Sequence, residues 1–454
     1  MIDIRALVDV DNATQSKRIF WDEDIFQLEL ERVFARCWLF LTHESLLREP
    51  GDFFTTRMGL DEVIVLRQRD GSIKAFLNHC THRGMKLCMA ESGNAKGFSC
   101  NYHGWGFGID GELKGVPAED EAYGPSFDRS KHGLRKVPRV ESYRGFVFGC
   151  LDADAPSLEE YLGGIGPLMD AWADVPGGVE LLGPPSRSIV AGNWKVPTEN
   201  FIGDAYHVPW SHASANAALG AAVDVKFMCG PDVGFQVTSR NGHGLGILYG
   251  AATITAGIMF PAIRDWHVKR GAELKEKHGE QRAALYDGHW NAAIFPNFCY
   301  LFGTNTFKLW NPIGPNRMEI LTWTMVEKDM PEELKQSVRI AADRLFGMAG
   351  TLESDDLDNF DYCNRPNQGF VTRQGVVSCR MGQGNEWEDP ALPDLVVGEY
   401  ISELGYRGFY RFYADCMATG GWEELQATTA GWKERLLSKS VRAGNPKIEE
   451  REIG

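Results

Sequence analysis

The stretch CTHRGMKLCMAESGNAKGFSCNYHGW, residues 80–105, constrains this chain more than any other part of its sequence. It contains a Cys-x-His pair, Cys80 and His82, followed by a Cys-x-x-His pair, Cys100 and His103. Each pair lies on a short stretch that ends in a glycine, which lets the backbone turn tightly. Cysteines and histidines at such close spacing are typical of metal ligands. The segment is therefore predicted to form two loops that hold one metal centre.

Two kinds of metal centre use two cysteines and two histidines. Zinc is the simpler one, but the usual zinc-finger motif places both cysteines before both histidines, whereas the order here alternates. Two loops with one thiolate and one imidazole each suit a [2Fe–2S] cluster, in which the cysteines hold one iron and the histidines the other. This is the Rieske arrangement. The sequence favours it over zinc.

The overall composition restricts the class of protein. The chain has 454 residues and a formal net charge of −15. Negative charge disfavours nucleic acid and anionic membranes as partners, because both bind cationic surfaces. The N-terminus lacks a basic-then-apolar signal pattern, and no apolar run approaches the ~20 residues that span a bilayer. We therefore expect a cytoplasmic protein with no nucleic-acid or membrane partner.

Ten cysteines in a chain of this length do not indicate a disulfide framework, which belongs to short secreted domains. Apart from Cys80 and Cys100, the cysteines have no metal-ligand spacing to a histidine. We expect these others to be small buried hydrophobic residues: Cys37, Cys88, Cys150, Cys229, Cys299, Cys363, Cys379 and Cys416.

The hydrophobic pattern changes along the N-terminal third of the chain. Residues 21–40 open with helical spacing, whereas residues 52–152 are short β-branched and aromatic runs between Gly and Asp turns. These runs predict strands, among them 52–58, 62–68, 72–77 and 145–150. A boundary follows at 153–164, where Pro156 and Ser157 can start a helix.

The later part of the chain predicts an α+β fold. Residues 290–302 and 306–326 have the pattern of long antiparallel strands, the second folded back at the NPIGPN turn. Residues 330–347 predict a helix capped by Asp329, with Pro331 near its start and Gly347 after its end. Strand runs followed by helix runs favour α+β over alternating βαβ units. We expect the N-terminal helix to pack with this region, so that the β-rich block is an insert.

A second candidate metal site lies in ENFIGDAYHVPWSHAS, residues 199–214. On a regular helix His207 and His212 would point ~140° apart. Pro209 lies between them and forbids an undistorted helix, so a local break can turn both imidazoles inward. Two histidines and a carboxylate form the iron(II) site of oxygen-activating enzymes, although this histidine spacing also occurs in cores and on surfaces. Asp204, one turn before His207, can accept the second N–H of that imidazole or lie on a helix surface.

These motifs together resemble the large (α) subunits of Rieske non-heme iron aromatic ring-hydroxylating dioxygenases of the naphthalene and biphenyl dioxygenase type. The resemblance runs nearly end to end and rests on IFQLELERVFARCWLF, CTHRG, CNYHGW, NFIGDAYHVPWSHAS and AGTLESDDLDNF. Respiratory-type Rieske carriers have a further cysteine in each loop, where Met85 and Tyr102 stand here. The oxygenase branch therefore fits better. Within this branch, the chain resembles the members that act on polycyclic aromatic hydrocarbons.

The resemblance implies a β-rich Rieske domain, residues 38–156, inserted in a catalytic domain of residues 1–37 and 157–454. The catalytic domain would have a helix-grip-like fold, with a large antiparallel sheet flanked by helices. Four residues would hold the [2Fe–2S] cluster: Cys80, His82, Cys100 and His103. His207, His212 and one acid of the ESDD stretch would hold a mononuclear Fe(II). Alignment to the family pattern selects Asp356 from Glu353, Asp355, Asp356 and Asp358, each of which would also suit a solvated helix start.

The resemblance also assigns roles around the iron. Asp204 would connect the two centres by hydrogen bonds to His207 and to a Rieske histidine of a neighbouring subunit, and Asn200 would lie near the open side of the iron. A third set of residues would line the substrate pocket, with core packing as the competing interpretation of each: Phe201, Val208, His289, Asn291, Leu301, Phe346 and Leu352. Naphthalene-type members have a bulky aromatic residue at the position of Leu352. The smaller side chain here implies a longer pocket, so this chain is expected to accept substrates of three or more fused rings.

The implied activity is that of the terminal oxygenase of a multicomponent dioxygenase. Electrons from NADH would pass through a reductase and a ferredoxin to the cluster, and both atoms of O2 would be added to an apolar aromatic substrate to give a cis-dihydrodiol. A small β subunit would complete an α3β3 assembly. The alternatives are a Rieske monooxygenase or demethylase acting on a substituted arene, a Rieske electron carrier without oxygenase activity, and a zinc-binding interaction module.

Overall fold

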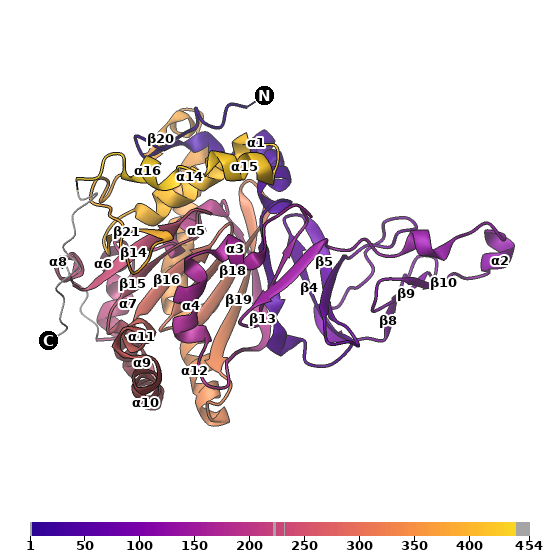
Figure 1. The fold of residues 1–454 in the computed structure, drawn as a ribbon, viewed down its shortest axis with the longest axis horizontal. Coiled ribbons are helices and arrows are strands. Elements are labelled where there is room, and N and C mark those ends of the chain that lie inside the picture. The colour runs from indigo at the N-terminus through magenta and orange to yellow at the C-terminus, as the bar shows by residue number, and fades with distance from the viewer. Residues whose placement is uncertain (1, 221–223, 231, 442–454) are drawn as a thin grey trace. The chain divides into compact units, whose positions relative to one another are not determined.

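The computed structural model describes residues 2–220, 224–230 and 232–441, and the chain divides into two compact units (Figure 1). One unit consists of residues 1–33 and 159–454, and the other of residues 34–158. The second unit is continuous in sequence and interrupts the first, as expected of an insert. The functional boundaries at residues 38 and 156 stay a proposal.

The unit of residues 34–158 is built from three small antiparallel sheets. In spatial order, their strands are β6 (Ile73–Leu77), β5 (Asp61–Arg67), β4 (Asp52–Met58) and β7 (Ser92–Asn94); β10 (Leu113–Gly115), β9 (Gly106–Gly108) and β8 (Gly97–Ser99); and β11 (Arg139–Tyr143), β12 (Phe146–Cys150) and β3 (Leu39–His43). The four strands predicted from the β-branched and aromatic runs are present as β4, β5, β6 and β12. In β5, Val63, Ile64 and Val65 are all buried, so both faces of this strand are covered.

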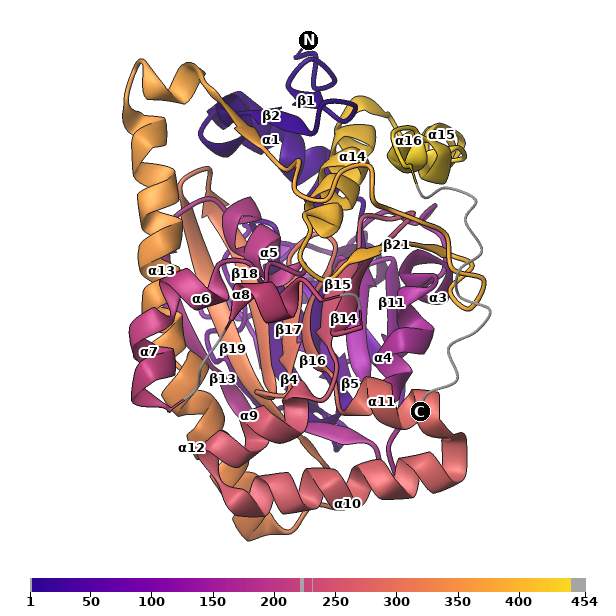
Figure 2. The same ribbon diagram turned by 90° about the vertical axis from the view of Figure 1, so that its left-hand side faces the viewer.

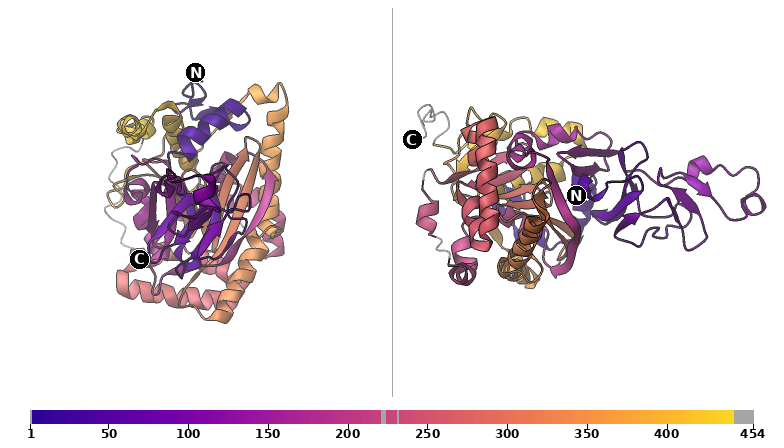
Figure 3. Two further views of the ribbon diagram at one scale, coloured as in Figure 1. Left: turned by 90° about the vertical axis from the view of Figure 1, so that its right-hand side faces the viewer. Right: turned by 90° about the horizontal axis from the view of Figure 1, so that it is seen from below.

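The larger unit is organised around an eight-stranded antiparallel sheet (Figure 2). Its order is β13 (Val179–Ala191), β19 (Arg317–Glu327), β18 (Thr306–Gly314), β17 (Phe298–Phe302), β16 (His289–Ile294), β15 (Gly244–Leu248), β14 (Gly234–Ser239) and β21 (Leu395–Glu399). Helices α12 (Glu332–Phe346) and α13 (Thr351–Asn364) lie along one side of this sheet, and α10 (Pro261–His278) runs beneath it (Figures 2 and 3). Helix α14 (Leu404–Ala418) packs on β14 and β15. The predicted α+β class is confirmed.

The N-terminal segment belongs to the larger unit, as expected. Helix α1 (Glu23–Glu29) ends in Glu29, whose buried carboxylate accepts hydrogen bonds from Lys195 Nζ (2.6 Å), Trp194 Nε1 (2.8 Å) and the Tyr413 hydroxyl (2.6 Å). Strand β2 (Thr14–Ser16) pairs with β1 (Val8–Asp9) and with β20 (Val376–Ser378). The remaining α-helices of the described residues are α2 (Glu119–Ala122), α3 (Leu158–Leu162), α4 (Ile165–Ala173), α5 (Lys195–Phe201), α6 (Val208–Ser211), α7 (Ala213–Ala218), α8 (Val225–Met228), α9 (Ala251–Met259), α11 (Glu280–Tyr286), α15 (Trp422–Thr428) and α16 (Trp432–Leu437).

Residues 290–302 do not form the single long strand that their apolar pattern predicts. They fold into a hairpin of β16 and β17, in which Trp290 lies opposite Phe302. Pro296 lies in the connecting turn, where its missing N–H breaks no sheet hydrogen bond. Nearly every residue of both strands is buried, so the sequence is apolar on both sides of the turn. This continuous apolar pattern gives no sign of where the first strand ends.

Asp329 does not cap helix α12, contrary to the prediction. The residue before the helix is Pro331, which offers no side-chain cap, and no other residue in the described ranges caps the first turn through its side chain. The Asp329 carboxylate instead accepts two hydrogen bonds from Arg270 Nη2, at 2.7 and 2.6 Å. A charged pair of this kind is stronger than a cap, so Asp329 turns toward α10.

The expectation for the eight cysteines without metal-ligand spacing has an outcome in the described residues. Cys229 and Cys363 are exposed, so the expectation of burial is wrong for these two of the eight cysteines without metal-ligand spacing. Across residues 2–220, 224–230 and 232–441, no helix has both the length and the apolar character needed to cross a membrane.

Candidate metal centres and active-site cavity

The loops of the Cys-x-His and Cys-x-x-His motifs repeat one backbone pattern. The amide of Gly84 donates to the carbonyl of Cys80, and the amide of Gly104 donates to the carbonyl of Cys100, with an N···O distance of 2.9 Å in both. Gly84 and Gly104 have φ values of +76° and +73°, which favour glycine. The two glycines therefore close two similar turns that each present a cysteine and a histidine.

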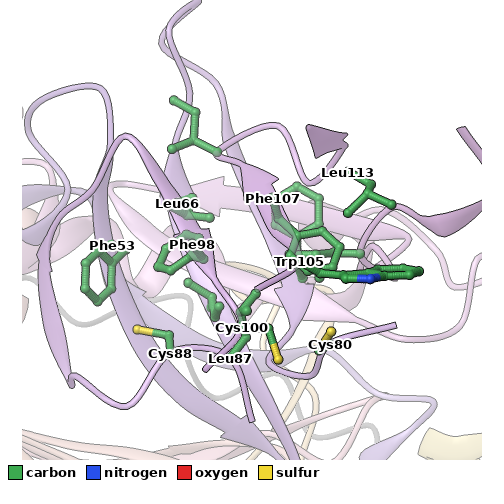
Figure 4. Close-up of a cluster of buried hydrophobic side chains, with 14 residues drawn as sticks. Phe53, Leu66, Cys80, Leu87, Cys88, Phe98, Cys100, Trp105, Phe107 and Leu113 are labelled. Carbon is green, nitrogen blue, oxygen red and sulfur yellow. The ribbon is translucent and has the colours of Figure 1, made fainter. Parts of the chain in front are cut away.

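The two cysteines are embedded in the apolar core of the smaller unit. Cys80 and Cys100 pack in one cluster with Trp105 and Phe107 (Figure 4). Burial raises the pKa of the Cys80 thiol, and the neighbouring Cys100 raises it further. Two neighbouring buried thiols ionise readily only when a metal compensates the charge of their thiolates.

The two histidines of these loops also lie together. The ring centroids of His82 and His103 are 4.6 Å apart, and His82 stacks on Trp105 at 4.8 Å. His82 Nδ1 is buried and has no hydrogen-bond partner in the described part of the chain. An imidazole nitrogen without a partner, beside a buried pair of thiols, fits the mixed cysteine and histidine ligation of a Rieske cluster.

The predicted break near His207 and His212 is present, and it falls at His212. Pro209 lies in the first turn of α6, where proline is tolerated, and His212 separates α6 from α7 with φ −100° and ψ 21°. This backbone change brings the two imidazole rings to a centroid distance of 5.2 Å. Asp356, on α13, points at the same place.

Three ligand atoms converge there. Asp356 Oδ1 lies 3.5 Å from His207 Nε2 and 3.3 Å from His212 Nε2, and the possible ligand atoms of the three residues all lie within 4.8 Å of one another. Asp356 Oδ1 is buried and has no hydrogen-bond partner among the described residues. Ligand atoms bound ~2.1 Å from one ion lie ~3 Å apart, so these residues fit a two-histidine, one-carboxylate metal site.

The electrostatics of this trio suit a cation. Burial disfavours a charged His207, yet the neighbouring carboxylates of Asp204 and Asp356 raise its pKa to about 10. Burial likewise opposes charge on Asp356, but the two histidines hold the pKa of its carboxyl below the usual value. Without a metal the site favours bound protons, and a divalent cation can take their place.

Asp204 and Asn200 both contact His207. Asp204 Oδ1 accepts the backbone N–H of His207 at 3.2 Å, and Oδ2 lies 3.4 Å from His207 Nδ1. Asn200 Nδ2 lies 3.3 Å from His207 Nε2, the nitrogen that faces Asp356. Tyr406 donates its hydroxyl to Asp204 Oδ2 at 3.0 Å. The sequence did not point to Tyr406, because 202 residues separate it from Asp204.

The acids of the ESDD stretch have four different surroundings. Only Asp356 faces both histidines, whereas Asp355 Oδ2 lies 3.1 Å from His212 Nδ1 and Asp358 is exposed. Glu353 forms a buried ion pair with Lys308, with a Nζ···Oε2 distance of 2.7 Å. Because Glu353 precedes Asp356 by one helical turn, this pair anchors the same face of α13 to the central sheet.

Replacing Lys308 with Met should lower the free energy of unfolding by about 3–5 kcal/mol, because Glu353 would keep a buried carboxylate without its ion-pair partner. Chemical denaturation measures this change, and a Lys308→Met/Glu353→Leu double variant should recover most of it. Arg365→Met is the matched control, because its ion pair with Asp361 on the same helix is exposed. A Lys308→Met variant as stable as this control would rule out the anchoring role.

A cavity of about 310 Å³ lies against the histidine–aspartate trio. Asn200 and all the residues proposed for the substrate pocket contribute to its wall: Phe201, Val208, His289, Asn291, Leu301, Phe346 and Leu352. Their role in substrate binding remains a proposal. The sequence interpretation missed the wall formed by α8 and α9, including Phe227, Ile254 and Ile258. These three apolar side chains are also exposed, and apolar side chains exposed together often mark a binding site, but this sign appears only in the structure.

Comparisons with known proteins agree with this geometry. Residues 169–419 match the family described as the ring hydroxylating alpha subunit (catalytic domain), and residues 37–143 match the Rieske [2Fe-2S] domain. The large oxygenase component of the naphthalene 1,2-dioxygenase system of Pseudomonas aeruginosa is 43% identical over 96% of this chain and 98% of its own length. The corresponding component of the 2,4-dinitrotoluene dioxygenase system of Burkholderia sp. (strain RASC) is 42% identical over the same shares.

A solved structure leads to the same family. The crystal structure of a naphthalene 1,2-dioxygenase variant bound to phenanthrene superposes with a TM-score of 0.91 at 41% identity, over 96% of this chain and 100% of that one. The chain therefore belongs to the ring-hydroxylating α-subunit family, the large oxygenase components of Rieske non-heme iron dioxygenases, and it combines a Rieske [2Fe–2S] domain with a histidine–histidine–aspartate candidate metal site.

Proposed function

We propose that this chain is the terminal oxygenase component of a dioxygenase system that adds both atoms of O2 to a polycyclic aromatic hydrocarbon and forms a cis-dihydrodiol. The observation that carries this proposal is the convergence of His207, His212 and Asp356 at the wall of a largely apolar cavity, in a chain that also has a Rieske domain. Such a cavity suits a substrate that has shape but no charge.

The proposed cofactors follow the residues described above. Cys80, His82, Cys100 and His103 would hold the cluster, within a Rieske domain of residues 38–156. His207, His212 and Asp356 would hold one Fe(II), within a catalytic domain of residues 1–37 and 157–454. When bound, this iron supplies the activation of O2. The protein itself positions the arene, excludes water and keeps the ligand geometry.

Particular side chains would do this work around the trio. Asp204 fixes the orientation of His207 through its two contacts, and it would link this histidine to a Rieske histidine of a neighbouring subunit. Asn200 holds an amide at the ligating nitrogen of His207, beside the cavity. Apolar side chains, Leu301 and Phe346 among them, would orient the ring by contact alone.

A large oxygenase component implies further proteins in the same system. We propose a small β subunit in an α3β3 assembly, a ferredoxin, and a reductase that takes electrons from NADH. A cytoplasmic location also remains a prediction.

The alternative reactions have less support. The cavity wall contains no Lys or Arg within the described residues, so an arene with a carboxylate, as in a salicylate-type monooxygenase, would find no cationic partner there. A pure electron carrier has no use for a buried histidine–aspartate trio beside a cavity. The dioxygenase is therefore the function that we favour.

Product analysis tests the proposed function. Purified enzyme, supplied with electrons by a surrogate reductase and ferredoxin, is incubated with naphthalene, biphenyl and phenanthrene. We expect cis-dihydrodiols from fused arenes. Phenols or dealkylated products in place of dihydrodiols would identify a monooxygenase, and the absence of any oxidised product with a fully reduced cluster would identify an electron carrier.

Leu352 is expected to set the length of the cavity. Leu352→Trp should lower the rate with phenanthrene by at least about tenfold relative to naphthalene, because the indole would fill space that a third ring needs. The measurement is the ratio of the two kcat/KM values. Ile340→Trp, on the exposed face of α12, is the control and should leave the ratio unchanged. An unchanged ratio in Leu352→Trp would refute this role of Leu352.

A further inference from the structure

One wall of the cavity is polar, and its residues are not those of the metal trio. His289, Asn291 and Thr304 contribute to this wall, which we call the polar wall. Thr304 and Asn291 are each 8% exposed. His289 Nδ1 and Thr304 Oγ1 are buried and have no hydrogen-bond partner within the described ranges of the chain.

The sheet brings these three side chains to one place. His289 and Asn291 alternate along β16, so they project from the same face of the sheet. The ring of His289 lies over Gly303, since a Cβ atom built at Gly303 would be 2.6 Å from His289 Nδ1. Thr304 follows Gly303 directly, in the connection from β17 to β18. A glycine at position 303 leaves the room that the imidazole of His289 occupies, next in sequence to Thr304.

Two other polar residues of the cavity wall, Thr255 and Asn216, are bonded to backbone carbonyls. The Thr255 hydroxyl donates to the Ala251 carbonyl at 2.8 Å, and Asn216 Nδ2 donates to the Val208 carbonyl at 3.3 Å. Buried polar atoms in proteins nearly always have a partner, and an atom that lacks one calls for an explanation, such as a bound group. The unpaired atoms of the polar wall therefore indicate a ligand group.

The polar wall is uncharged. Burial lowers the pKa of His289 to about 4, so its ring is neutral at neutral pH and carries one N–H donor and one acceptor nitrogen. The Asn291 amide and the Thr304 hydroxyl can also donate and accept. A neutral set of this kind matches a neutral oxygen atom and gives no advantage to a carboxylate or an ammonium group.

We propose that the polar wall binds the oxygen of an uncharged, oxygen-substituted fused arene, a ketone or an alcohol, while the apolar remainder of the cavity holds the rings. This inference deepens the proposed function and rests on it, because it names a substrate class for the same cavity. It assigns His289, Asn291 and Thr304 as specificity-determining residues.

The test uses three ligands with one ring skeleton: fluorene, 9-fluorenone and 9-fluorenol. Their dissociation constants are measured by equilibrium dialysis with the oxidised holoenzyme under anaerobic conditions, so that no turnover occurs. In Thr304→Val and Asn291→Leu, the affinity for at least one oxygenated ligand should fall about fivefold to tenfold relative to fluorene, the effect of losing one hydrogen bond. Loss for the alcohol alone would show that the wall accepts a hydrogen bond from the ligand.

Thr255→Val is the matched control, because it removes a cavity hydroxyl that is already bonded to the backbone. Its ligand ratios should equal those of the wild type. Ratios in both Thr304→Val and Asn291→Leu that equal the control would overturn the inference, even if naphthalene is converted to its dihydrodiol. Altered ratios without dihydrodiol from any arene would instead support the polar wall and overturn the proposed function.

Discussion

Asp356→Ala is expected to abolish ring oxidation, with turnover reduced at least about 1,000-fold. Asp356 Oδ1 is the carboxylate atom that faces both His207 Nε2 and His212 Nε2, and no other acid of α13 is placed to replace it. Loss of a residue that only orients a metal ligand already costs about 10–100-fold, so loss of a ligand should cost more. Iron content should fall from about three to about two atoms per chain, while the Rieske absorption and EPR signals persist.

Asp358→Ala provides the control for this prediction. Asp358 lies on the same helix but is exposed, so this variant should keep both its iron content and its activity. An Asp356→Ala enzyme that retains a third iron and oxidises naphthalene at the wild-type rate would remove Asp356 from the site.

Asp204→Ala is expected to lower turnover at least about 100-fold while both metal centres stay bound. The carboxylate of Asp204 accepts the backbone N–H of His207 and the hydroxyl of Tyr406, and it would carry the link to the cluster of the neighbouring subunit. The cluster should still be reduced at the normal rate by a chemical reductant. Stopped-flow measurement of cluster reoxidation in the presence of substrate and O2 should show the loss.

Tyr406→Phe distinguishes the effect of the Asp204 carboxylate from the effect of the hydrogen bond that it accepts from Tyr406. This variant keeps Asp204 and removes only the hydrogen bond from the hydroxyl at 3.0 Å, so its turnover should fall far less than that of Asp204→Ala. Wild-type reoxidation kinetics in Asp204→Ala would refute the proposed link between the two centres.

The parts of the molecule that depend on local spacing could be predicted from the sequence. The turns that present Cys80 and Cys100 depend on the glycine that ends each loop, and this glycine follows its cysteine by only four residues in both loops. The sequence predicts a helix break near Pro209 that brings His207 and His212 together. The break falls at His212 instead, because the proline is accommodated at the start of α6. Four strands of the smaller unit, β4, β5, β6 and β12, were also predictable, since turns separate their β-branched and aromatic runs.

Features that depend on distant partners could not be predicted. Glu353 and Asp356 lie on one helical face, and only the position of Lys308 in the sheet shows which of the two is already paired. Asp329 has the sequence position of a helix cap, but Arg270 from α10 takes its carboxylate. The polar wall depends on Thr304, whose neighbours give no sign that its hydroxyl is buried without a partner.

Oxidation of naphthalene under ¹⁸O2 tests the proposed dioxygenation most directly. If His207, His212 and Asp356 hold an iron that directs both oxygen atoms to one arene, the dihydrodiol should contain two ¹⁸O atoms, and its mass should rise by about 4 Da. The label should disappear with the product in Asp356→Ala. A product with one labelled oxygen and one from water would contradict dioxygenation by this site.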